Sequence, residues 1–526
     1  MARRAPERHE ESSWRGLGVR AAREPGVTRN RARFVAGLAA FIAILAVAAY
    51  LRFVDLASNP GGLYPDEAAE GLDALRMLHQ PGFHPDWLVW FTDDGGREAL
   101  FAYIVAGMFG IFGGSVLVLR ETAAAIGVAG VLGIGWLARR WGPIVSISAA
   151  GWAAGSLWLV AVSRDGMRNT MVPLFGSVAL IALLRWSDRP GRRGAAIAGA
   201  TVAIASLYTY QPLKLLPVLA ALWLVCLRHI DRSRFEAMKP GFVSAIATFL
   251  VVGAPMLAVA ATEPASYFGR IAAVSPIDPY VQSGGSLPDH IVRTIGMFGF
   301  FGDPNARQDV SSLPLVSIPI ALIAAIGVGR LWRLRGQPAE SLILLALPVF
   351  MLPPLIAVEG GSPHFLRSLG LAVPLAVTIG IGVREIVGWG AGWRPSFGRV
   401  LGVAAAGLLV ATAIVTGVAY LDRPVRDRWD GFSYPIVALA DAARSHPGAA
   451  VIVDDYSAMD VEFLDFDSPP AIFTPGARIE APQRYAAVLA ASRSDLAGAL
   501  GSAAAADARP IAWDPWGNAT VWEAAP

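Results

Sequence analysis

Cysteine is almost missing from this 526-residue chain, because Cys226 is the only one. A single cysteine excludes an intramolecular disulfide and gives no sign of a cysteine metal site. Lysine is nearly as scarce, since only Lys214 and Lys239 stand among the 44 basic residues. We interpret the preference for Arg as a compositional bias of the genome, and we expect no nucleic-acid partner.

Charge of either sign is also scarce. Only 16% of the residues are charged, where a soluble domain has about 25%. Apolar runs of roughly 17–22 residues recur along the chain and explain the deficit, because about 20 residues cross a bilayer. The sequence also lacks a Walker-type loop, a GxGxxG motif, a nucleophile elbow and metal-ligand spacing of His. These features predict a polytopic helical membrane protein.

Basic clusters set the expected topology. Residues 1–33 hold nine Arg against four Glu, and we expect this segment to be a disordered, cytoplasmic basic tail. The apolar run Phe34–Val54 is typical of a signal anchor. With the later basic clusters kept inside, eleven membrane spans are expected, at about 34–54, 120–138, 143–162, 171–186, 194–209, 212–228, 241–260, 313–331, 339–356, 366–386 and 400–420.

Three shorter segments belong to the outer loops. Residues 99–112 are apolar, but counting spans outward from the basic clusters leaves no crossing for them, so a juxtamembrane or re-entrant helix is expected. Glu67–Leu78 has apolar residues at helical spacing and predicts an amphipathic helix on the membrane surface. Asp289–Phe300 predicts a second juxtamembrane helix.

Residues 421–526 differ from the rest of the chain. They are acidic and contain no run long enough to span a membrane. Short apolar strands such as 451–453 and 485–489 alternate with helical patterns such as 436–444 and 494–500. This alternation predicts a small extracytoplasmic α/β domain, following a transmembrane domain that covers residues 34–420.

The acidic pair Asp66-Glu67 follows the first apolar run. Pro65-Asp66 before an Ala-rich helix predicts an N-cap, with Glu67 favoured near the positive helix end. The pair also suits catalysis, because a carboxylate can accept a proton from an acceptor hydroxyl. Asp165 has two interpretations as well: an ion pair with Arg164 or Arg168, or a carboxylate that binds acceptor or metal. These alternatives stay open.

Basic residues on the outer side of the membrane call for an explanation, since Lys and Arg are normally concentrated on the cytoplasmic side. Such residues suit the binding of a phosphate at one leaflet, or they snorkel and pair with loop acids. Tyr208 and Tyr210, beside Lys214, either line a head-group pocket or mark the interface. The outer cations are Arg97, Arg120, Arg164, Arg168, Lys214, Arg270, Arg293, Arg307 and Arg367, with His364 close to the last.

Four stretches, in this order, resemble the GT-C glycosyltransferases of the family 39 type, the group of the protein mannosyltransferases and the aminoarabinose lipid A transferases. The first outer loop does so through its acidic pair, its helix and Gly96-Arg97-Glu98-Ala99-Leu100-Phe101-Ala102-Tyr103. The others are Leu119-Arg120-Glu121-Thr122 with Leu137–Gly142, then Ser163–Asn169, and finally Pro363-His364-Phe365-Leu366-Arg367. The resemblance covers roughly residues 34–420. It implies an all-α GT-C-like membrane protein with juxtamembrane helices and the small C-terminal domain.

The resemblance also implies roles. Such enzymes use a polyprenyl-phosphate sugar donor at the outer leaflet of the plasma (inner) membrane and invert the anomeric centre as they transfer to an extracytoplasmic acceptor hydroxyl. Asp66 would be the general base and Glu67 its partner. The donor phosphate would be held by Arg367, Lys214, His364, Arg164 and Arg168, and acceptor or sugar would contact Asp165, Arg97, Glu98 and Tyr210.

Two positions depart from the pattern of this family. Ala99 stands where Pro is usual, and Phe365 stands where Tyr is frequent, so the substrate class stays open. No cofactor is expected, although metal use varies in the superfamily. A transporter or flippase for a lipid-linked saccharide and an inactive scaffold subunit are the alternatives to an enzyme.

Overall fold

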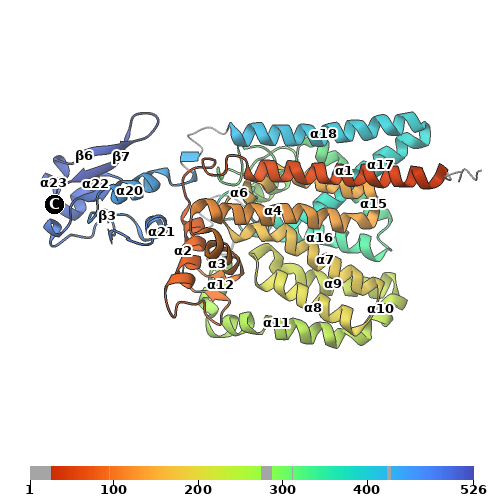
Figure 1. Ribbon diagram of the computed structural model, residues 1–526. Helices are drawn as coiled ribbons and strands as arrows, with labels where there is room; N and C mark the ends of the chain where they lie inside the picture. The colour runs from red at the N-terminus through yellow and green to blue at the C-terminus, as the bar shows by residue number, and fades with distance from the viewer. Residues whose placement is uncertain are drawn as a thin grey trace, which may run out of the picture.

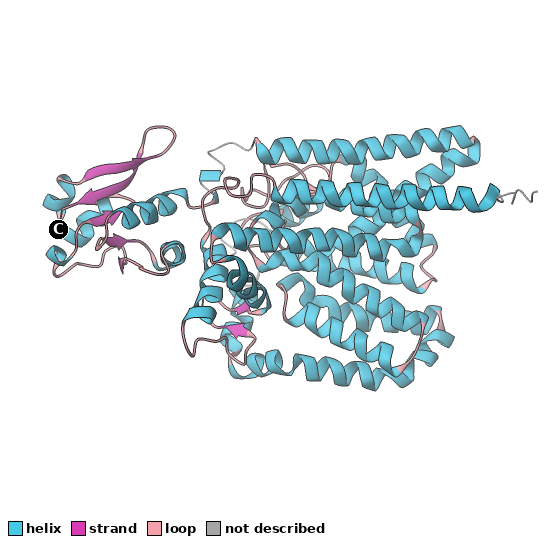
Figure 2. Cartoon of the chain, in the orientation of Figure 1, coloured by secondary structure: helices cyan, strands magenta, loops and turns pink. Residues whose placement is uncertain are grey.

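Helices lie side by side in one bundle, and a smaller domain containing most of the strands projects from one end (Figures 1 and 2). The computed structural model describes residues 25–93, 95–273, 287–310, 312–422, 428–429 and 431–525, with side chains from residue 35 onward and without those of residues 270–273. The two parts, a helical bundle and a C-terminal α/β domain, agree with the fold class expected from the sequence.

The bundle is built from α1 (Pro25–Phe53), α4 (Val116–Ala138), α5 (Pro143–Gly155), α6 (Leu157–Arg164), α7 (Val172–Asp188), α8 (Arg192–Leu207), α9 (Leu216–Ile230), α10 (Arg232–Met238), α11 (Phe242–Thr262), α15 (Ile318–Arg333), α16 (Pro338–Ile356), α17 (Ala372–Trp393) and α18 (Pro395–Leu421). Each of the eleven expected spans therefore overlaps a helix for most of its length. α1 begins at Pro25, so the expectation of disorder is wrong for residues 25–33, because the helix of the first span extends into the basic tail. Residues 1–24 lie outside the described part of the chain.

Length limits how many of these helices can cross a bilayer. Among the described residues, eight are long and apolar enough, or nine if α5 and α6, which are bent by 56° at their junction, form one broken span. α8 and α15 have 16 residues each, a rise of about 24 Å, which is short of the roughly 30 Å hydrocarbon core. A total of eleven crossings therefore stays a prediction.

Short elements gather at the end of the bundle that carries the C-terminal domain (Figure 1). They include α2 (Pro65–His79), α3 (Leu100–Phe112), α12 (Pro264–Ala273), α14 (Leu287–Gly296) and a hairpin of β1 (Trp90–Phe91) and β2 (Arg97–Glu98). α3 has 13 residues, about 20 Å, so it is too short to cross and is a short helix as expected. α14 supplies the helix expected in the second outer loop.

α2 forms where the sequence predicts a helix, but it does not rest on the membrane surface with its polar face in water. Its apolar residues Leu72 and Leu75 pack against Phe101 and Val105 of α3. Its acidic residues Glu67 and Glu70 are also buried, at 0% and 1% exposure. The expectation of a water-exposed polar face is therefore wrong, because arginines from other elements cover this face, while the position of the helix at the membrane surface stays a prediction.

The C-terminal domain is an α/β unit, as the sequence predicts. Its five-stranded sheet has the order β4-β3-β5-β7-β6, with β3 parallel to β4 and β5, and β7 antiparallel to β5 and β6. Apolar clusters from alternating strand positions cover both faces of the sheet. The elements are α20 (Tyr434–Ser445), β3 (Ala450–Ile452), α21 (Asp455–Leu464), β4 (Ala471–Phe473), β5 (Val488–Ala490), α22 (Arg493–Leu500), α23 (Ser502–Ala506), β6 (Arg509–Trp513) and β7 (Ala519–Ala524).

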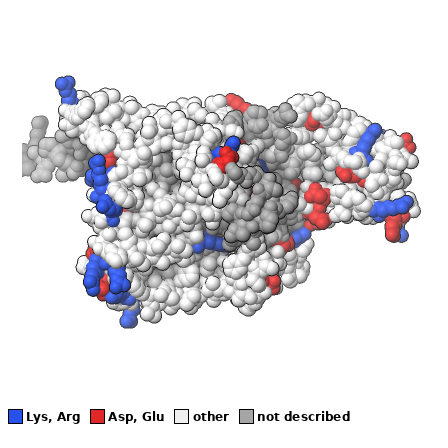
Figure 3. Space-filling view, turned by 180° about the vertical axis from the view of Figure 1, so that it is seen from behind, with Lys and Arg blue, Asp and Glu red and all other residues white. Residues whose placement is uncertain are grey.

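Exposed basic side chains gather at the opposite end of the bundle, away from the C-terminal domain (Figure 3). Arg140 and Arg234 reach Asp188 there, and Lys239 pairs with Glu236. These pairs are between about one third and one half exposed. The two ends of the bundle therefore differ in charge, and the short elements and the C-terminal domain occupy the end with fewer surface cations.

Candidate active site

α2 carries a buried row of carboxylates. Glu67, Glu70 and Asp73 recur every three residues, which places them along one side of the helix, and none is more than 1% exposed. A buried carboxylate is costly unless it is paired. Each of the three has an arginine partner, and the arginines come from three different elements.

Glu67 is held by Arg120 of α4. Arg120 Nε donates to Glu67 Oε1 at 2.6 Å and its Nη2 donates to Oε2 at 2.8 Å. The Gly166 backbone N–H donates to Oε1 at 2.9 Å. Arg120 also donates to the carbonyls of Gly61 and Gly62. Glu67 therefore ties α2 to α4 and to the turn after α6.

Glu70 begins a second network through Arg168, in the short helix η2 (Arg168–Met171). Arg168 Nη1 donates to Glu70 Oε1 at 2.6 Å, and its Nε donates to Glu98 Oε2 at 3.1 Å. Lys214 Nζ, in η3 (Gln211–Leu215), lies 3.3 Å from the other oxygen of Glu98. Glu98 thus joins two of the cations that the sequence assigned to phosphate.

Aromatic rings surround these two cations. Lys214 Nζ lies 4.5 Å from the ring centre of Tyr267 and 5.5 Å from that of Trp90. The Arg168 guanidinium lies 5.7 Å from the Tyr210 ring. Such cation–π contacts hold a cation in place without neutralising it. Tyr210 and Glu98, both expected at the site, therefore lie beside Arg168.

Asp73 pairs with Arg97 of β2 at 2.6 Å, and Arg97 is only 2% exposed. Burial raises the pKa of the Asp73 carboxyl to about 7, against the Arg97 charge, which lowers it. Arg97 also reaches Asp93 at 3.4 Å. The pair fixes the hairpin of the first outer loop onto α2.

Asp66 is the exception on α2, because it is only half-buried and, within the described part of the chain, no arginine pairs with it. Tyr64, not Asp66, is the N-cap residue of α2, and no side chain caps the helix, so the N-cap interpretation is wrong. Asp66 lies in the first helical turn, after Pro65, where a negative charge is favoured by the helix dipole. The Tyr456 hydroxyl of α21 donates to Asp66 Oδ1 at 2.5 Å.

The late turn contains His364 and Arg367 and leads into η5 (Leu369–Leu371). Arg367 donates to the carbonyl of Ala357 at 2.8 Å and to Glu359 Oε2 at 3.0 Å. Asp303 accepts from the Phe365 N–H at 2.6 Å, and burial raises the pKa of the Asp303 carboxyl to about 6. Because η5 lies against η3, the turn is a neighbour of the Lys214 segment.

Arg164 is placed differently from the other cations. It donates to the carbonyls of Leu51, in the last turn of α1, and of Val54 and Asn59, which follow that helix. Arg52 of α1 binds the end of a different helix, because it donates to the carbonyls of Ala153 and Ala154 in the last turn of α5. Arg164 therefore closes a helix end and is not brought together with Arg168 and Lys214.

The cationic side chains of the site differ in how far they are exposed to solvent. The side chains of Lys214 and Arg367 are each 15% exposed. Those of Arg97, Arg120 and Arg168 are 2%, 1% and 6% exposed. Arg367 can therefore reach a ligand, whereas Lys214 Nζ is itself buried, so a ligand would have to displace its contact with Glu98. The other three cations mainly hold the first outer loop together.

The sequence did not single out several residues of this arrangement. Glu70 and Asp73 carry a recognisable signal, because their spacing of three from Glu67 marks one face of a helix. Tyr456 and Asp460 carry none, since they lie in a different domain, about 390 residues away. Asp165 was identified, and it is buried beside Arg120, within range of its charge.

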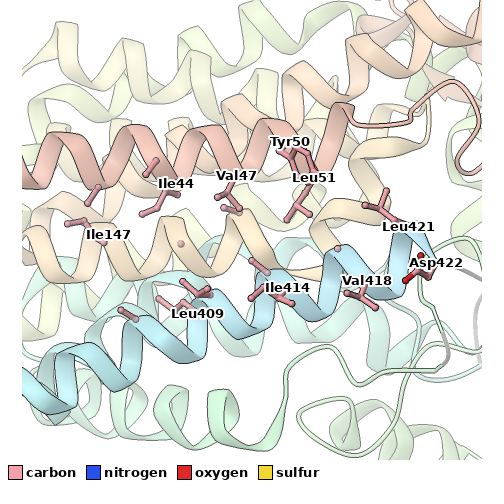
Figure 4. A pocket seen from close by; sticks show the side chains of 18 residues that line it. Ile44, Val47, Tyr50, Leu51, Ile147, Leu409, Ile414, Val418, Leu421 and Asp422 are labelled. Carbon is pink, nitrogen blue, oxygen red and sulfur yellow. The ribbon is translucent and has the colours of Figure 1, made fainter.

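An apolar cavity of about 680 Å³ lies away from these charges, between α1, α5 and α18 (Figure 4). Its walls include Ile44, Val47, Leu409 and Ile414, with Asp422 at one end. A wall of this kind suits a lipid chain, and none of its described lining residues is a cation. Among the described residues, no group of three or more His, Cys, Asp or Glu is arranged to hold a metal ion.

Comparisons with known proteins bear on the fold. No protein-family model and no curated protein sequence matches the chain. The crystal structure of ArnT from Cupriavidus metallidurans bound to undecaprenyl phosphate is similar, with a TM-score of 0.56 and 14% identity over 92% of this chain and 97% of that one. Its apo structure gives a TM-score of 0.55 and 15% identity over the same shares. The chain therefore shares the fold of these two ArnT structures.

Proposed function

We propose that this chain is a GT-C membrane glycosyltransferase that moves a sugar from a polyprenyl-phosphate donor to an acceptor hydroxyl on the outer side of the plasma (inner) membrane. One observation carries the proposal. Of the four acids on the first two turns and a half of α2, three are locked to buried arginines, and Asp66 alone is half-exposed. The ion pairs of Glu67, Glu70 and Asp73 hold α2 in place, and Asp66 lies at the start of this fixed helix.

Asp66 is assigned the role of general base. A positioned carboxylate accepts the proton of an acceptor hydroxyl as its oxygen attacks the anomeric carbon. The bond between that carbon and the phosphate oxygen breaks on the opposite face, so the configuration inverts. Glu67 supports this step by holding the first turn of α2 through Arg120 and Gly166.

Lys214 and Arg367 are assigned to the leaving phosphate. Charge that develops on the phosphate is stabilised by cations already in place. Lys214 is held at 3.3 Å from Glu98, a contact that a phosphate can replace without leaving Lys214 unpaired. The undecaprenyl phosphate in the similar ArnT structure supports a ligand of this class. Arg168 supports the site by positioning Glu98.

The charge distribution supports the proposed side of the membrane. Basic residues collect on the cytoplasmic side of membrane proteins. In this chain they gather at the end of the bundle opposite α2 and the C-terminal domain (Figure 3). We therefore assign Asp66 and the C-terminal domain to the extracytoplasmic side and the amino terminus to the cytoplasm.

The test is a transfer reaction with the purified full chain in liposomes. Radiolabelled undecaprenyl-phosphate hexose and pentose donors are supplied with washed native membranes as the acceptor. We expect the label to move from lipid to the membrane glycan or protein fraction. Movement of the intact labelled lipid between leaflets without transfer would support a flippase instead. A folded protein that binds none of the donors would indicate an inactive scaffold subunit.

A further inference from the structure

One helix of the C-terminal domain, α21, lies against α2 of the first outer loop. Tyr456, Asp460 and Phe463 are spaced by four and three residues, so they share one face of α21. Phe463 is 5% exposed, and its ring stacks on Phe109 of α3 with centres 6.2 Å apart. Gly71 of α2 leaves room for this ring, since an added Cβ would meet it. The C-terminal domain therefore packs directly against α2 and α3.

Tyr456 reaches the acid assigned as the base. Its hydroxyl donates to Asp66 Oδ1 at 2.5 Å, and its ring meets Tyr64 edge-on at 5.9 Å between centres. An acceptor hydroxyl must make this same kind of hydrogen bond before it can give up its proton. The Tyr456 hydroxyl therefore occupies a position that the acceptor requires.

Asp460, one turn along, is a buried acid without a hydrogen bond. It is 0% exposed, and within the described part of the chain neither of its carboxyl oxygens has a hydrogen-bond partner. Asp66, Glu67 and Asp454 are close enough to act on it electrostatically. Burial raises the pKa of the Asp460 carboxyl well above its usual range. Native proteins rarely leave such a group unpaired unless it has a task.

We propose that α21 forms the acceptor subsite and stands here in its closed position, with the Tyr456 hydroxyl in the place of an acceptor hydroxyl on Asp66. This inference rests on the proposed function. When acceptor binds, α21 moves away from α2, an acceptor hydroxyl replaces that of Tyr456, and a second one donates to Asp460. The Asp66 carboxylate thereby keeps a hydrogen-bond partner, and the Asp460 carboxyl gains one.

The charges on this face indicate the class of acceptor. Asp66 and Asp454 carry negative charge at the contact between α2 and α21, where the Asp460 carboxyl is neutral and Glu462 pairs with Arg76 at 2.7 Å. A surface with this excess of acids repels an anionic group. We therefore assign the subsite to a neutral, hydroxyl-rich acceptor, such as a glycan, and not to a phosphorylated one.

Chemical crosslinking tests the required motion. Arg76→Cys and Glu462→Cys are introduced together in a Cys226→Ser background and joined by a reducible bis-methanethiosulfonate reagent. We expect transfer to washed native membranes to fall by about tenfold when the domain is locked closed. Reduction restores transfer, and binding of undecaprenyl phosphate is unchanged throughout. The two single-cysteine variants, treated alike, are the controls. Transfer at the rate of these controls in the locked protein would overturn the inference.

Tyr456→Phe gives a second, independent measurement, because it removes the hydroxyl and keeps the ring on Tyr64. With the competing hydroxyl gone, less membrane acceptor is needed for half-maximal transfer, and the maximal rate is retained. A lower maximal rate at the same acceptor requirement would mean that Tyr456 only positions Asp66, against the inference. If Asp66→Asn abolishes transfer while locking has no effect, the acceptor subsite fails and the proposed function stands. Wild-type transfer by Asp66→Asn would instead reject the assigned base.

Discussion

Arg120 of α4 binds Glu67 of α2 through two nitrogens, at 2.6 and 2.8 Å, with both side chains only 1% exposed. The same guanidinium donates to the carbonyls of Gly61 and Gly62 in the segment that leads to α2. One arginine therefore fixes both the start of α2 and its first turn. Asp66 lies beside Glu67, so its position depends on this ion pair.

Breaking that pair should destabilise the protein strongly. Arg120→Ala leaves Glu67 buried without its countercharge, and we expect a loss of about 3–5 kcal/mol in unfolding free energy. The measurement is the thermal unfolding temperature in detergent. Arg140→Ala is the matched control, since Arg140 pairs with Asp188 at 33% and 35% exposure, where a pair contributes about 0–1 kcal/mol. Equal shifts for the two variants would contradict the structural role of Arg120.

The two lysines of the chain offer a matched test of the phosphate site. We expect Lys214→Gln to weaken binding of undecaprenyl phosphate by about tenfold, because it removes a charge-assisted contact of roughly 1.5–3 kcal/mol. Lys239→Gln removes the same charge from a residue that is 49% exposed and paired with Glu236, and it should leave binding unchanged. Native mass spectrometry with the lipid measures both. Equal affinities of the Lys214 variant and the wild type would exclude Lys214 from the phosphate site.

Asp460 predicts a pH dependence of stability. Burial raises the pKa of its carboxyl well above the usual 3.8, so the folded protein holds this proton more tightly than the unfolded chain. The stability from the neutral carboxyl is complete below the unfolded pKa and is lost as pH rises through the folded pKa. As pH rises above the unfolded pKa of 3.8, the unfolding temperature should fall more steeply in the wild type than in Asp460→Asn, whose side chain does not titrate. Parallel pH profiles would show that Asp460 does not titrate in this way.

Topology can be read from introduced cysteines, because Cys226→Ser provides a cysteine-free chain. Ser468→Cys in the C-terminal domain and Pro190→Cys in the loop between α7 and α8 are both exposed. In intact cells we expect a membrane-impermeant maleimide to label position 468 only, and position 190 after permeabilisation. Labelling of both positions from the same side would contradict an odd number of crossings between positions 190 and 468.

The sequence predicts the broad architecture well because its signals are local. Apolar runs mark the helices, and alternating patterns mark the strands of the C-terminal domain. α2 shows where local signals end: its spacing predicts a helix, but Glu67 and Glu70 are buried by Arg120 and Arg168, which lie about 50 and 100 residues away. Periodicity cannot reveal such pairings, and for that reason the prediction that the polar face of α2 is exposed to water was wrong.

The same limit applies to the candidate site. Arg168 and Glu98 were named from motifs, and Lys214 and Tyr210 from their expected position on the outer side. The structure places Arg168 and Lys214 at Glu98 and the Tyr210 ring beside Arg168. Arg164 was also named from a motif, yet it donates to backbone carbonyls at and after the end of α1. The last carbonyls of a helix need such donors, and the spacing of residues in the sequence does not reveal which side chain supplies them. Tyr456 reaches Asp66 from another domain and could be found only from the fold.

The central claim is that Asp66 accepts the acceptor proton, and Asp66→Asn tests it most directly. The substitution keeps the shape of the side chain and removes its basicity. We expect transfer from the radiolabelled undecaprenyl-phosphate sugar to fall by about 10²–10⁴-fold, the usual contribution of a general base, with undecaprenyl phosphate still bound. Asp86→Asn, at an exposed position of the same loop, should transfer like the wild type. Transfer by Asp66→Asn at the wild-type rate would contradict the account.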